Sequence, residues 1–364
     1  MSQPWETHTT LRLNGENYSR QELLLCSKDK LKNSKNPEWE KVIFRFIVEW
    51  LNNKNNVVVK TSGSTGNPKN ILIEKNRMID SAKATNTFFD LDKSKKALLC
   101  LSADYIAGKM MIVRAFVGGF DLHYAETKSD VLLKNNVNFD FTAVVPLQLE
   151  SVLKSENALP INRIKKIIVG GAALRKDLIQ KLEQVETEVW TTYGMTETIT
   201  HIALQRLNGK HKTDYFQALP NVEFQLDERN CLRINAPLVS LNPIQTNDEV
   251  ILLNSQQFRF LGRADFIINS GGIKLSPEIL EQKMALYIET CFAFSSVKDE
   301  VLGERLVLVI ESKPYSEAKF NKLNEILKTI LNRFEEPKEI IFSDNFPRMT
   351  NGKLNRIKLK EEIS

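Results

Sequence analysis

A segment rich in glycine and hydroxyl residues could hold a phosphate. It follows the apolar run 57–59 and reads Thr61-Ser62-Gly63-Ser64-Thr65-Gly66-Asn67-Pro68-Lys69. Backbone N–H groups of such a loop can converge on a phosphate, and Lys69 adds a positive charge. Flexible surface loops have a similar composition, but the strand expected before this loop and the helix expected after it favour the phosphate loop. It is not a Walker A loop, which needs other glycine spacing and Ser or Thr after the lysine, where this chain has Asn70.

A second segment places one carboxylate among several hydroxyl groups. It is predicted to lie just after the strand 188–190 and reads Thr191-Thr192-Tyr193-Gly194-Met195-Thr196-Glu197-Thr198. Oxygen ligands of this kind suit Mg²⁺, whose remaining positions are filled by water and phosphate oxygens. Taken alone, the segment could equally be a capped turn, since Thr196 and Glu197 would suit the start of a helix, and this alternative stays open at this point.

Two later segments present a cation beside a turn. Arg263, in Gly262-Arg263-Ala264-Asp265, could reach a ribose or a phosphate, or form an ordinary surface salt bridge. In the segment 347–356, Asn351-Gly352 is a strong tight-turn signal that would hold Lys353 out on a hairpin. A flexible basic tail is the alternative for this second segment.

Short β-branched runs alternate with helical periodicity over the first 220 residues. Met78, Ala82, Thr85 and Phe89 fall on one face of a helix expected at 75–89. A further helix is expected at about 174–184, and strands are expected at 57–59, 97–101, 143–145, 166–169 and 188–190. Strands that alternate with helices predict a largely parallel sheet covered by helices.

The pattern changes after residue 220 and again near Asp265. Short alternating runs at 222–226 and 249–253 predict a β-rich subdomain, and a small α+β unit follows. In that unit Ser276 with Pro277 is a helix start, and 306–310 is a strand. An amphipathic helix is expected at 316–335, with the apolar stripe Phe320, Leu323, Leu327, Ile330, Leu331 and Phe334. We therefore predict an α/β fold with an N-terminal domain, 1–264, and a small α+β C-terminal domain, 265–364.

Composition limits the function classes without choosing among them. The chain has 364 residues with 50 basic and 45 acidic ones, a net charge of +5 that suits anionic ligands and does not indicate nucleic acid. Four scattered cysteines predict reduced thiols rather than disulfides or zinc. No apolar run approaches the roughly 20 residues of a membrane span, and residues 1–6 lack signal-peptide character. We expect a cytoplasmic protein; oligomeric state leaves no signal in the sequence.

In this order and spacing, the four segments resemble the core motifs of the acyl- and aryl-CoA synthetase, adenylation-domain and luciferase superfamily. The resemblance runs from about residue 57 to 356. Within the superfamily, the compact length and Ala103-Asp104-Tyr105-Ile106-Ala107-Gly108-Lys109 look most like the o-succinylbenzoate–CoA ligases of menaquinone biosynthesis. The resemblance implies a small carboxylic acid, ATP and CoA as substrates, Mg²⁺ as cofactor, and an acyl-adenylate intermediate.

The resemblance also implies roles for individual residues. Glu197 matches the Mg²⁺ ligand, and Thr196 matches the residue at the α-phosphate. The phosphate loop corresponds to Thr61, Ser62, Gly63, Ser64, Thr65, Gly66 and Lys69. The adenine wall corresponds to Gly170, Gly171 and Ala172 with Thr192, Tyr193 and Gly194.

Further matches concern the ribose and the small domain. Asp248 matches the acid that binds the ribose, assisted by Arg263, although it stands in Thr-Asn-Asp where many members have Thr-Gly-Asp. Asp265 matches the interdomain hinge, although Phe266 follows where a second acid is common, and Lys353 matches the mobile catalytic lysine.

The acid and CoA sites have only candidates. Tyr105, Lys109, Thr200 and His201 are candidates for the acid because they lie near the motifs, and each could also be an ordinary surface or core residue. Gly272 and Lys274 are candidates for the CoA step.

Three other functions remain. An adenylation enzyme that loads a carrier-protein thiol would share every motif. A P-loop kinase or ATPase would explain the Gly/Ser loop but not the Lys353 hairpin, and it fails on glycine spacing. A nucleotide sensor without catalysis would tolerate the loss of Glu197 or Lys353.

Overall fold

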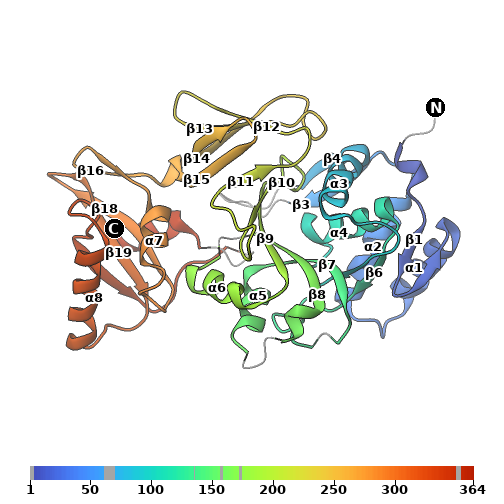
Figure 1. Ribbon diagram of the computed structural model, residues 1–364, viewed down its shortest axis with the longest axis horizontal. Coiled ribbons are helices and arrows are strands. Elements are labelled where there is room, and N and C mark those ends of the chain that lie inside the picture. The colour runs from blue at the N-terminus through green and yellow to red at the C-terminus, as the bar shows by residue number, and fades with distance from the viewer. Residues whose placement is uncertain (1–3, 61–69, 135, 156–158, 172–173, 350–353) are drawn as a thin grey trace.

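The computed structural model describes residues 4–60, 70–134, 136–155, 159–171, 174–349 and 354–364 (Figure 1). Within them, thirteen strands form one continuous sheet in the order β12-β13-β14-β15-β11-β10-β9-β8-β7-β5-β6-β1-β2. This sheet spans the N-terminal two thirds of the chain. Its two halves differ in strand direction.

The half that contains β5 to β9 is parallel, as the sequence predicts. Its strands are β5 (Lys96–Leu99), β6 (Asp121–Tyr124), β7 (Phe139–Val144), β8 (Ile164–Val169) and β9 (Glu188–Gly194). Its helices are α3 (Lys75–Phe89), α4 (Ile106–Gly118), α5 (Pro146–Leu153) and α6 (Lys176–Lys181). Met78, Ala82, Thr85 and Phe89 are all buried, which confirms the predicted apolar face of α3.

The far end of this half is formed by the first fifty residues. β1 (Leu11–Leu13) pairs in parallel with β6 and antiparallel with β2 (Glu16–Tyr18). Two helices follow, α1 (Arg20–Lys32) and α2 (Glu38–Leu51), and α2 buries Phe44, Phe46, Ile47 and Trp50 in the main core.

The other half of the sheet is antiparallel and contains the β-rich region expected after residue 220. It begins earlier than expected, because β10 (His201–Arg206) already pairs antiparallel with β9. It continues with β11 (Phe216–Ala218), β12 (Glu223–Leu226), β13 (Cys231–Asn235), β14 (Ile244–Asn254) and β15 (Gln257–Arg263). The β-rich region is thus continuous with the parallel half.

A separate two-stranded sheet flanks the predicted phosphate loop. β3 (Asn56–Lys60) is the strand expected before the loop, and it pairs antiparallel with β4 (Asn70–Glu74). The sequence did not predict β4, which stands between the loop and α3. The loop therefore connects the two strands of a hairpin.

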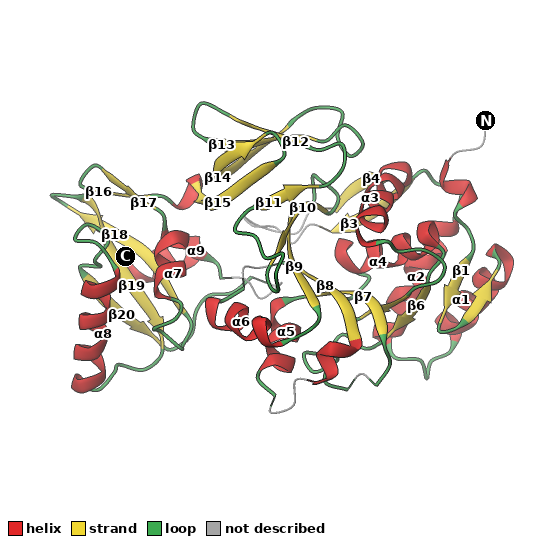
Figure 2. Cartoon of the chain, viewed as in Figure 1, coloured by secondary structure: helices red, strands yellow, loops and turns green. Residues whose placement is uncertain are grey.

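The C-terminal unit has its own sheet and its own core. The sheet order is β17 (Ile273–Leu275), β16 (Ile268–Ser270), β19 (Gly303–Glu311) and β18 (Phe292–Asp299), with β20 (Glu339–Ser343) parallel to β19. Its helices are α7 (Pro277–Met284), α8 (Glu317–Ile330) and α9 (Arg356–Ile363) (Figure 2). The hydroxyl of Ser276 accepts from the Ile279 N–H, which confirms the predicted helix start.

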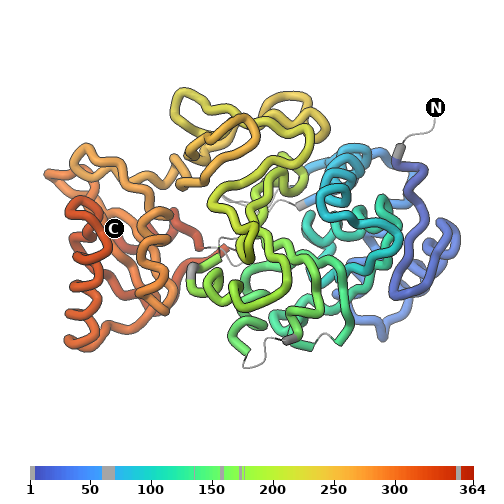
Figure 3. The backbone as a smooth tube through the Cα atoms, in the orientation of Figure 1, coloured from blue at the N-terminus to red at the C-terminus, as the bar shows by residue number. Residues whose placement is uncertain are grey.

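The chain passes from one sheet to the other in a short 3₁₀ turn, Ala264–Phe266 (Figure 3). The strands before it belong to the long sheet and the strands after it to the small one. We propose that the domains 1–264 and 265–364 divide here.

Three element boundaries differ from expectation. β9 extends to Gly194, so Thr191 to Gly194 lie within a strand and not after it, because they pair with β10. The helix expected at 174–184 is α6 followed by a 3₁₀ turn, Leu182–Gln184. α8 ends at Ile330 and leaves Phe334 62% exposed, because the Asn332 side chain accepts from the N–H groups of Phe334 and Glu335 and forms a new turn.

No helix in the described part of the chain is long and apolar enough to cross a membrane. That finding agrees with the lack of a long apolar run in the sequence.

Candidate active site

Some of the predicted site residues lie outside the described residues. These are Thr61, Ser62, Gly63, Ser64, Thr65, Gly66, Lys69, Ala172 and Lys353. Their described neighbours are the ends of β3 and β4 for the phosphate loop, and the antiparallel bridge between Arg348 and Leu354 for the lysine segment.

Tyr193, Asp248 and Arg263 come together as one polar group, in which Tyr193 and Asp248 are buried and Arg263 is partly exposed. Asp248 and Arg263 lie opposite each other on β14 and β15, with their closest charged atoms 3.4 Å apart. The Tyr193 hydroxyl, from β9, donates to Asp248 Oδ2 at 2.5 Å. Burial raises the pKa of Asp248, while the hydrogen bond from Tyr193 and the charge of Arg263 act to lower it. This arrangement presents a carboxylate that two donors hold in place, which suits recognition of a diol.

The same group reaches the predicted hinge. Arg263 Nη2 donates to Asp265 Oδ2 at 2.5 Å, and Asn247 Nδ2 donates to Asp265 Oδ1 at 2.8 Å. The Phe266 ring lies 5.9 Å from the guanidinium of Arg263 and 5.7 Å from that of Arg356, within cation–π range of both. The hinge residues therefore contact the proposed ribose site directly.

The carboxyl ends of β7, β8 and β9 meet at the glycines predicted for the adenine wall. The Gly170 N–H donates to the Val144 carbonyl at 3.1 Å, and the Thr192 hydroxyl donates to the Val169 carbonyl at 3.2 Å. A Cβ at Gly170 would lie 2.7 Å from Thr192 Oγ1, so only glycine fits without a shift. Ligands of open α/β sheets bind at the carboxyl ends of parallel strands. This edge is therefore the expected place for a base.

The segment after β9 is a turn, not the start of a helix. Thr198 Oγ1 accepts from the Met195 N–H at 2.9 Å and lies 2.7 Å from the Thr200 carbonyl, to which it donates. Ile199 takes a positive φ of 66°. Thr196 is half-buried and Glu197 is exposed. The segment is therefore the turn that the alternative described, without a helix after it, and the exposed Glu197 carboxylate is still accessible to a cation.

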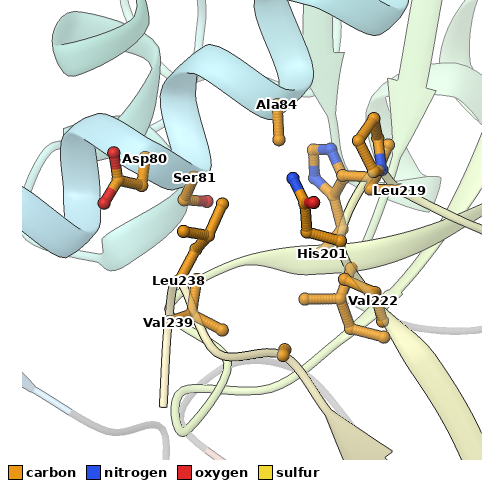
Figure 4. Close-up of a pocket in the computed structure, with 12 residues that line it drawn as sticks. Asp80, Ser81, Ala84, His201, Leu219, Val222, Leu238 and Val239 are labelled. Atoms are coloured by element: carbon orange, nitrogen blue, oxygen red, sulfur yellow. The ribbon is translucent and has the colours of Figure 1, made fainter. Parts of the chain in front are cut away.

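His201 lines a small pocket opposite α3, and Thr200 precedes it in the chain. Thr200 Oγ1 lies 2.9 Å from Ser81 Oγ, and His201 Nε2 lies 3.3 Å from Thr85 Oγ1. Figure 4 shows His201 facing the α3 residues Ser81 and Ala84, with Leu238 and other apolar side chains around them. Burial, followed by the charge of Arg114, lowers the pKa of His201 well below 6.5, so its ring is neutral.

Arg114 is the functional candidate that the sequence reasoning missed. It lies on α4 with 2% exposure, and its Nη1 donates to Met111 Sδ at 3.6 Å. Its Nε has no hydrogen-bond partner among the described residues, and burial lowers its pKa to about 9. Buried charges are normally paired. The signal was present in the sequence, because Arg114 interrupts the apolar run 110–117 of α4.

The family assignment follows from a sequence model and agrees with this geometry. The model described as AMP-binding enzyme matches residues 16–250, well over half of the chain. The chain belongs to the AMP-binding enzyme family. The resemblance inferred from the four motifs is thereby confirmed at the level of the family.

Individual proteins that are similar to this AMP-binding enzyme agree with the family assignment. The 2-succinylbenzoate–CoA ligase of Haemophilus influenzae is 26% identical over 296 residues, covering 76% of this chain but only 64% of that protein. An acyl-CoA synthetase (AMP-forming)/AMP-acid ligase II-like protein of Dyadobacter fermentans is 33% identical, covers 92% of this chain and 97% of its own, and superposes with a TM-score of 0.61. The o-succinylbenzoate–CoA synthetase of Bacillus subtilis, solved with ATP and magnesium, shares the fold at a TM-score of 0.75 and 17% identity, with 97% of each chain covered.

Two acid candidates of this AMP-binding enzyme lie apart from the pocket of His201. Tyr105 precedes α4 and is 48% exposed. Lys109 is buried, and its Nζ donates to Glu49 and to the Val58 carbonyl. Neither lines the pocket. Lys109 was a candidate for the acid site because it lies near a motif in the sequence, but its side chain contacts Glu49 and Val58 and not the pocket of His201.

The candidates for the CoA step lie on the small sheet. Gly272 belongs to the tight turn between β16 and β17 and has a φ of 81°. Lys274 is an exposed residue of β17 that pairs with Asn269. Both therefore belong to the C-terminal unit of this AMP-binding enzyme.

Proposed function

We propose that this AMP-binding enzyme is an acid–CoA ligase that converts o-succinylbenzoate, ATP and CoA into o-succinylbenzoyl-CoA, AMP and pyrophosphate. One observation carries the choice of acid. A buried guanidinium, Arg114, lies close enough to His201 for its charge to lower the pKa of that ring, and it has no carboxylate partner among the described residues. A substrate with a second carboxylate would supply the missing anion. The relative named 2-succinylbenzoate–CoA ligase supports this choice.

The nucleotide would lie across the carboxyl ends of β8 and β9. Its ribose hydroxyls would bind Asp248, with Arg263 beside it, and its base would lie against Gly170 and Tyr193. The loop 61–69 would hold the β- and γ-phosphates, and Thr196 would contact the α-phosphate. Asp248 is already held by two donors, so binding would require little rearrangement.

The first half-reaction would join the acid to AMP. A carboxylate of the acid attacks the α-phosphorus in line, and pyrophosphate leaves. Because little covalent chemistry falls to the protein, its contribution is positioning and electrostatic stabilisation. Lys353 would donate to the developing negative charge, and one such donor is worth about 3–4 kcal/mol.

The exposed carboxylate of Glu197 is suited to Mg²⁺. It lies just after β9 among hydroxyl groups, and hard cations prefer oxygen ligands. When bound, Mg²⁺ would neutralise charge on the phosphates. Glu197 would fix the position of that charge relative to the α-phosphate.

The acid would bind where α3 and β10 face each other, and the pocket there, about 20 Å³ in this structure, would have to open to admit it. The neutral His201 ring and the Ser81–Thr200 hydroxyl pair can hydrogen-bond a carbonyl or carboxylate without adding a second full charge. Arg114 would bind the carboxylate that does not react. Apolar side chains such as Leu219 and Val239 would contact the ring.

The second half-reaction would transfer the acyl group to CoA. The thiolate of CoA attacks the acyl carbon, and AMP leaves. We propose that the domain 265–364 first covers the adenylate, which limits its hydrolysis, and then moves about Asp265 so that Gly272 and Lys274 face CoA. Cytoplasmic location stays a prediction.

The runner-up is an adenylation enzyme that delivers the same kind of intermediate to a carrier-protein thiol. It would use the same nucleotide site and differ only in the acceptor. Another aryl or acyl acid is the other alternative, but a monocarboxylate would leave Arg114 unpaired.

The deciding experiment is ATP–pyrophosphate exchange with a panel of aromatic and aliphatic acids that includes o-succinylbenzoate, followed by addition of CoA. We expect exchange with o-succinylbenzoate and then formation of its CoA thioester. Exchange without transfer to CoA would favour a carrier-protein acceptor. Exchange only with monocarboxylates would contradict the proposed substrate, and no exchange with any acid would count against the ligase.

A further inference from the structure

An ion pair hydrogen-bonds the free edge of β3, the strand before the predicted phosphate loop. Glu49 Oε1 accepts from the Val58 N–H at 2.9 Å, and Lys109 Nζ donates to the Val58 carbonyl at 3.1 Å. The two side chains are joined to each other at 3.2 Å. Both backbone groups of one residue are thus satisfied by one ion pair.

The edge needs such a partner because β3 pairs only with β4 among the described residues. In an antiparallel pair, every second residue directs its N–H and C=O away from its neighbour strand. Val58 is such a residue, since its backbone groups meet side chains of α2 and α4 instead. An unpaired edge would leave β3 free to shift, and the predicted phosphate loop begins three residues later, at Thr61.

Lys109 is held firmly in this position. Its side chain is 9% exposed, and its ammonium lies 4.8 Å from the centre of the Phe46 ring. Gly108 lets α4 approach the preceding chain closely, because a Cβ there would lie 2.3 Å from the Ser102 carbonyl. Burial and close packing leave the ammonium few other positions.

We propose that Glu49 and Lys109 are positioning residues for the phosphate loop, acting through Val58, and that Lys109 does not contact the acid. The inference rests on the proposed function, because it needs the loop 61–69 to hold the β- and γ-phosphates. α4 would then carry two separate roles: Lys109 would hold the strand before the phosphate loop, and Arg114, five residues later, is the residue that the proposed function assigns to the second carboxylate of the acid.

Comparison of ATP with AMP tests this role, because AMP lacks the two phosphates that the loop would hold. We would measure the affinity of each nucleotide by titration calorimetry with Mg²⁺ present, in Lys109→Met, Glu49→Gln and the double variant. Lys134→Met is the matched control, since Lys134 forms an exposed ion pair with Asp130 at 2.6 Å.

We expect Lys109→Met to weaken ATP binding about tenfold or more and to change AMP binding less than about twofold, the scale of one charged hydrogen bond. Glu49→Gln should have a smaller effect of the same kind, because the amide oxygen still accepts from the Val58 N–H. The double variant should lose little more than Lys109→Met, since both changes break one unit. The control should bind both nucleotides like the wild type.

Several results would overturn the inference. Equal loss of ATP and AMP affinity would indicate a general structural role, and unchanged ATP affinity with a raised KM for the acid would return Lys109 to the acid site. If Lys109→Met fails to fold, judged by thermal unfolding, Glu49→Gln decides the question by the same comparison. A wild-type protein that binds neither nucleotide would reject the proposed function itself.

Discussion

At the scale of single residues, two buried charges are treated in opposite ways. Asp248 has a hydroxyl donor and a guanidinium beside it, whereas Arg114 has only a thioether at hydrogen-bond distance among its described contacts. An ion left without a partner in the interior costs several kcal/mol. A site that binds an anion contains an unpaired cation in the free protein, and this cation lowers the stability of the free protein. Replacement of Arg114 should therefore affect acid binding and the free energy of unfolding in opposite directions.

Arg114→Met should stabilise the protein and impair recognition of the acid. We expect the free energy of unfolding to rise by about 1 kcal/mol or more, because an apolar group replaces an uncompensated charge. We also expect the KM for o-succinylbenzoate to rise by about thirtyfold or more, the cost of removing one partner of a buried charge pair. Denaturant unfolding and pyrophosphate exchange measure the two effects. A less stable variant with unchanged KM would show that Arg114 is structural.

His201 predicts how stability depends on pH. Its pKa in the folded protein lies well below 6.5, so the unfolded chain binds the proton more readily. The stabilisation by the neutral ring is complete above pH 6.5 and declines as the pH falls below that value, by about 1.4 kcal/mol per pH unit.

Unfolding free energies at pH 7.5 and 5.5 for the wild type and His201→Gln would test this. The wild type should lose about 1.4 kcal/mol more than the variant over this interval. An equal loss in both proteins would mean that His201 takes up its proton without unfolding.

At the scale of elements, the end of β9 decides where the turn with Thr196 and Glu197 lies. Gly194 ends the strand, and the chain then turns back so that His201 begins β10 opposite it. A Cβ at Gly194 would lie 2.3 Å from the Thr200 carbonyl, which is backbone and cannot rotate away. The close approach at this glycine therefore fixes Thr196 and Glu197 at the end of the sheet.

Gly194→Ala should shift the turn and reduce adenylation by about tenfold or more, because small displacements of positioned groups are costly in rate. Overpacking should also cost about 1–3 kcal/mol of stability. Pyrophosphate exchange and thermal unfolding measure these effects. Gly303→Ala is a control, since Gly303 has a φ of 74° in the small sheet with no atom within 4 Å of an added Cβ. It should lower stability but keep the exchange rate, and loss of exchange in both variants would contradict the assignment.

At the scale of the whole molecule, the two sheets are joined through the proposed ribose site. Asn247 and Arg263 both bind Asp265, and Phe266 lies between Arg263 and Arg356. Arg356 also donates to the buried Glu281 at 2.5 Å, which anchors the start of α9 in the C-terminal unit. Lys353 stands three residues before Arg356.

Lys353→Ala should separate the two half-reactions. Adenylation should fall by two to three powers of ten, because the variant lacks the donor to the developing charge, at about 3–4 kcal/mol. Thioester formation from supplied acyl-adenylate and CoA should remain largely intact. Lys358→Ala is the control and should leave both steps unchanged, since Lys358 is exposed on α9 and its ammonium forms a long ion pair, 3.8 Å, with Glu362. Equal loss of both half-reactions in Lys353→Ala would contradict the assignment.

Motif spacing and periodicity were enough to predict the family, the alternation of strands and helices, the face of α3 and the helix start at Ser276. These are local properties, since they depend on residues within a few turns of one another. Element ends were less predictable. The Asn332 turn shortened α8, and pairing with β10 lengthened β9, because each boundary depends on competing hydrogen bonds.

The partners of individual side chains were decided only by the tertiary structure. Asp248, Tyr193 and Arg263 come from three strands, and their meeting depends on the sheet order. Lys109 and Arg114 stand five residues apart on one helix, yet Lys109 is paired with Glu49, whereas Arg114 has no carboxylate partner among the described residues. Sequence by itself determined which chemistry the chain carries, because that chemistry lies in short motifs. The tertiary structure decided which side chains are available for that chemistry, because burial and hydrogen-bond partners depend on residues far apart in the chain.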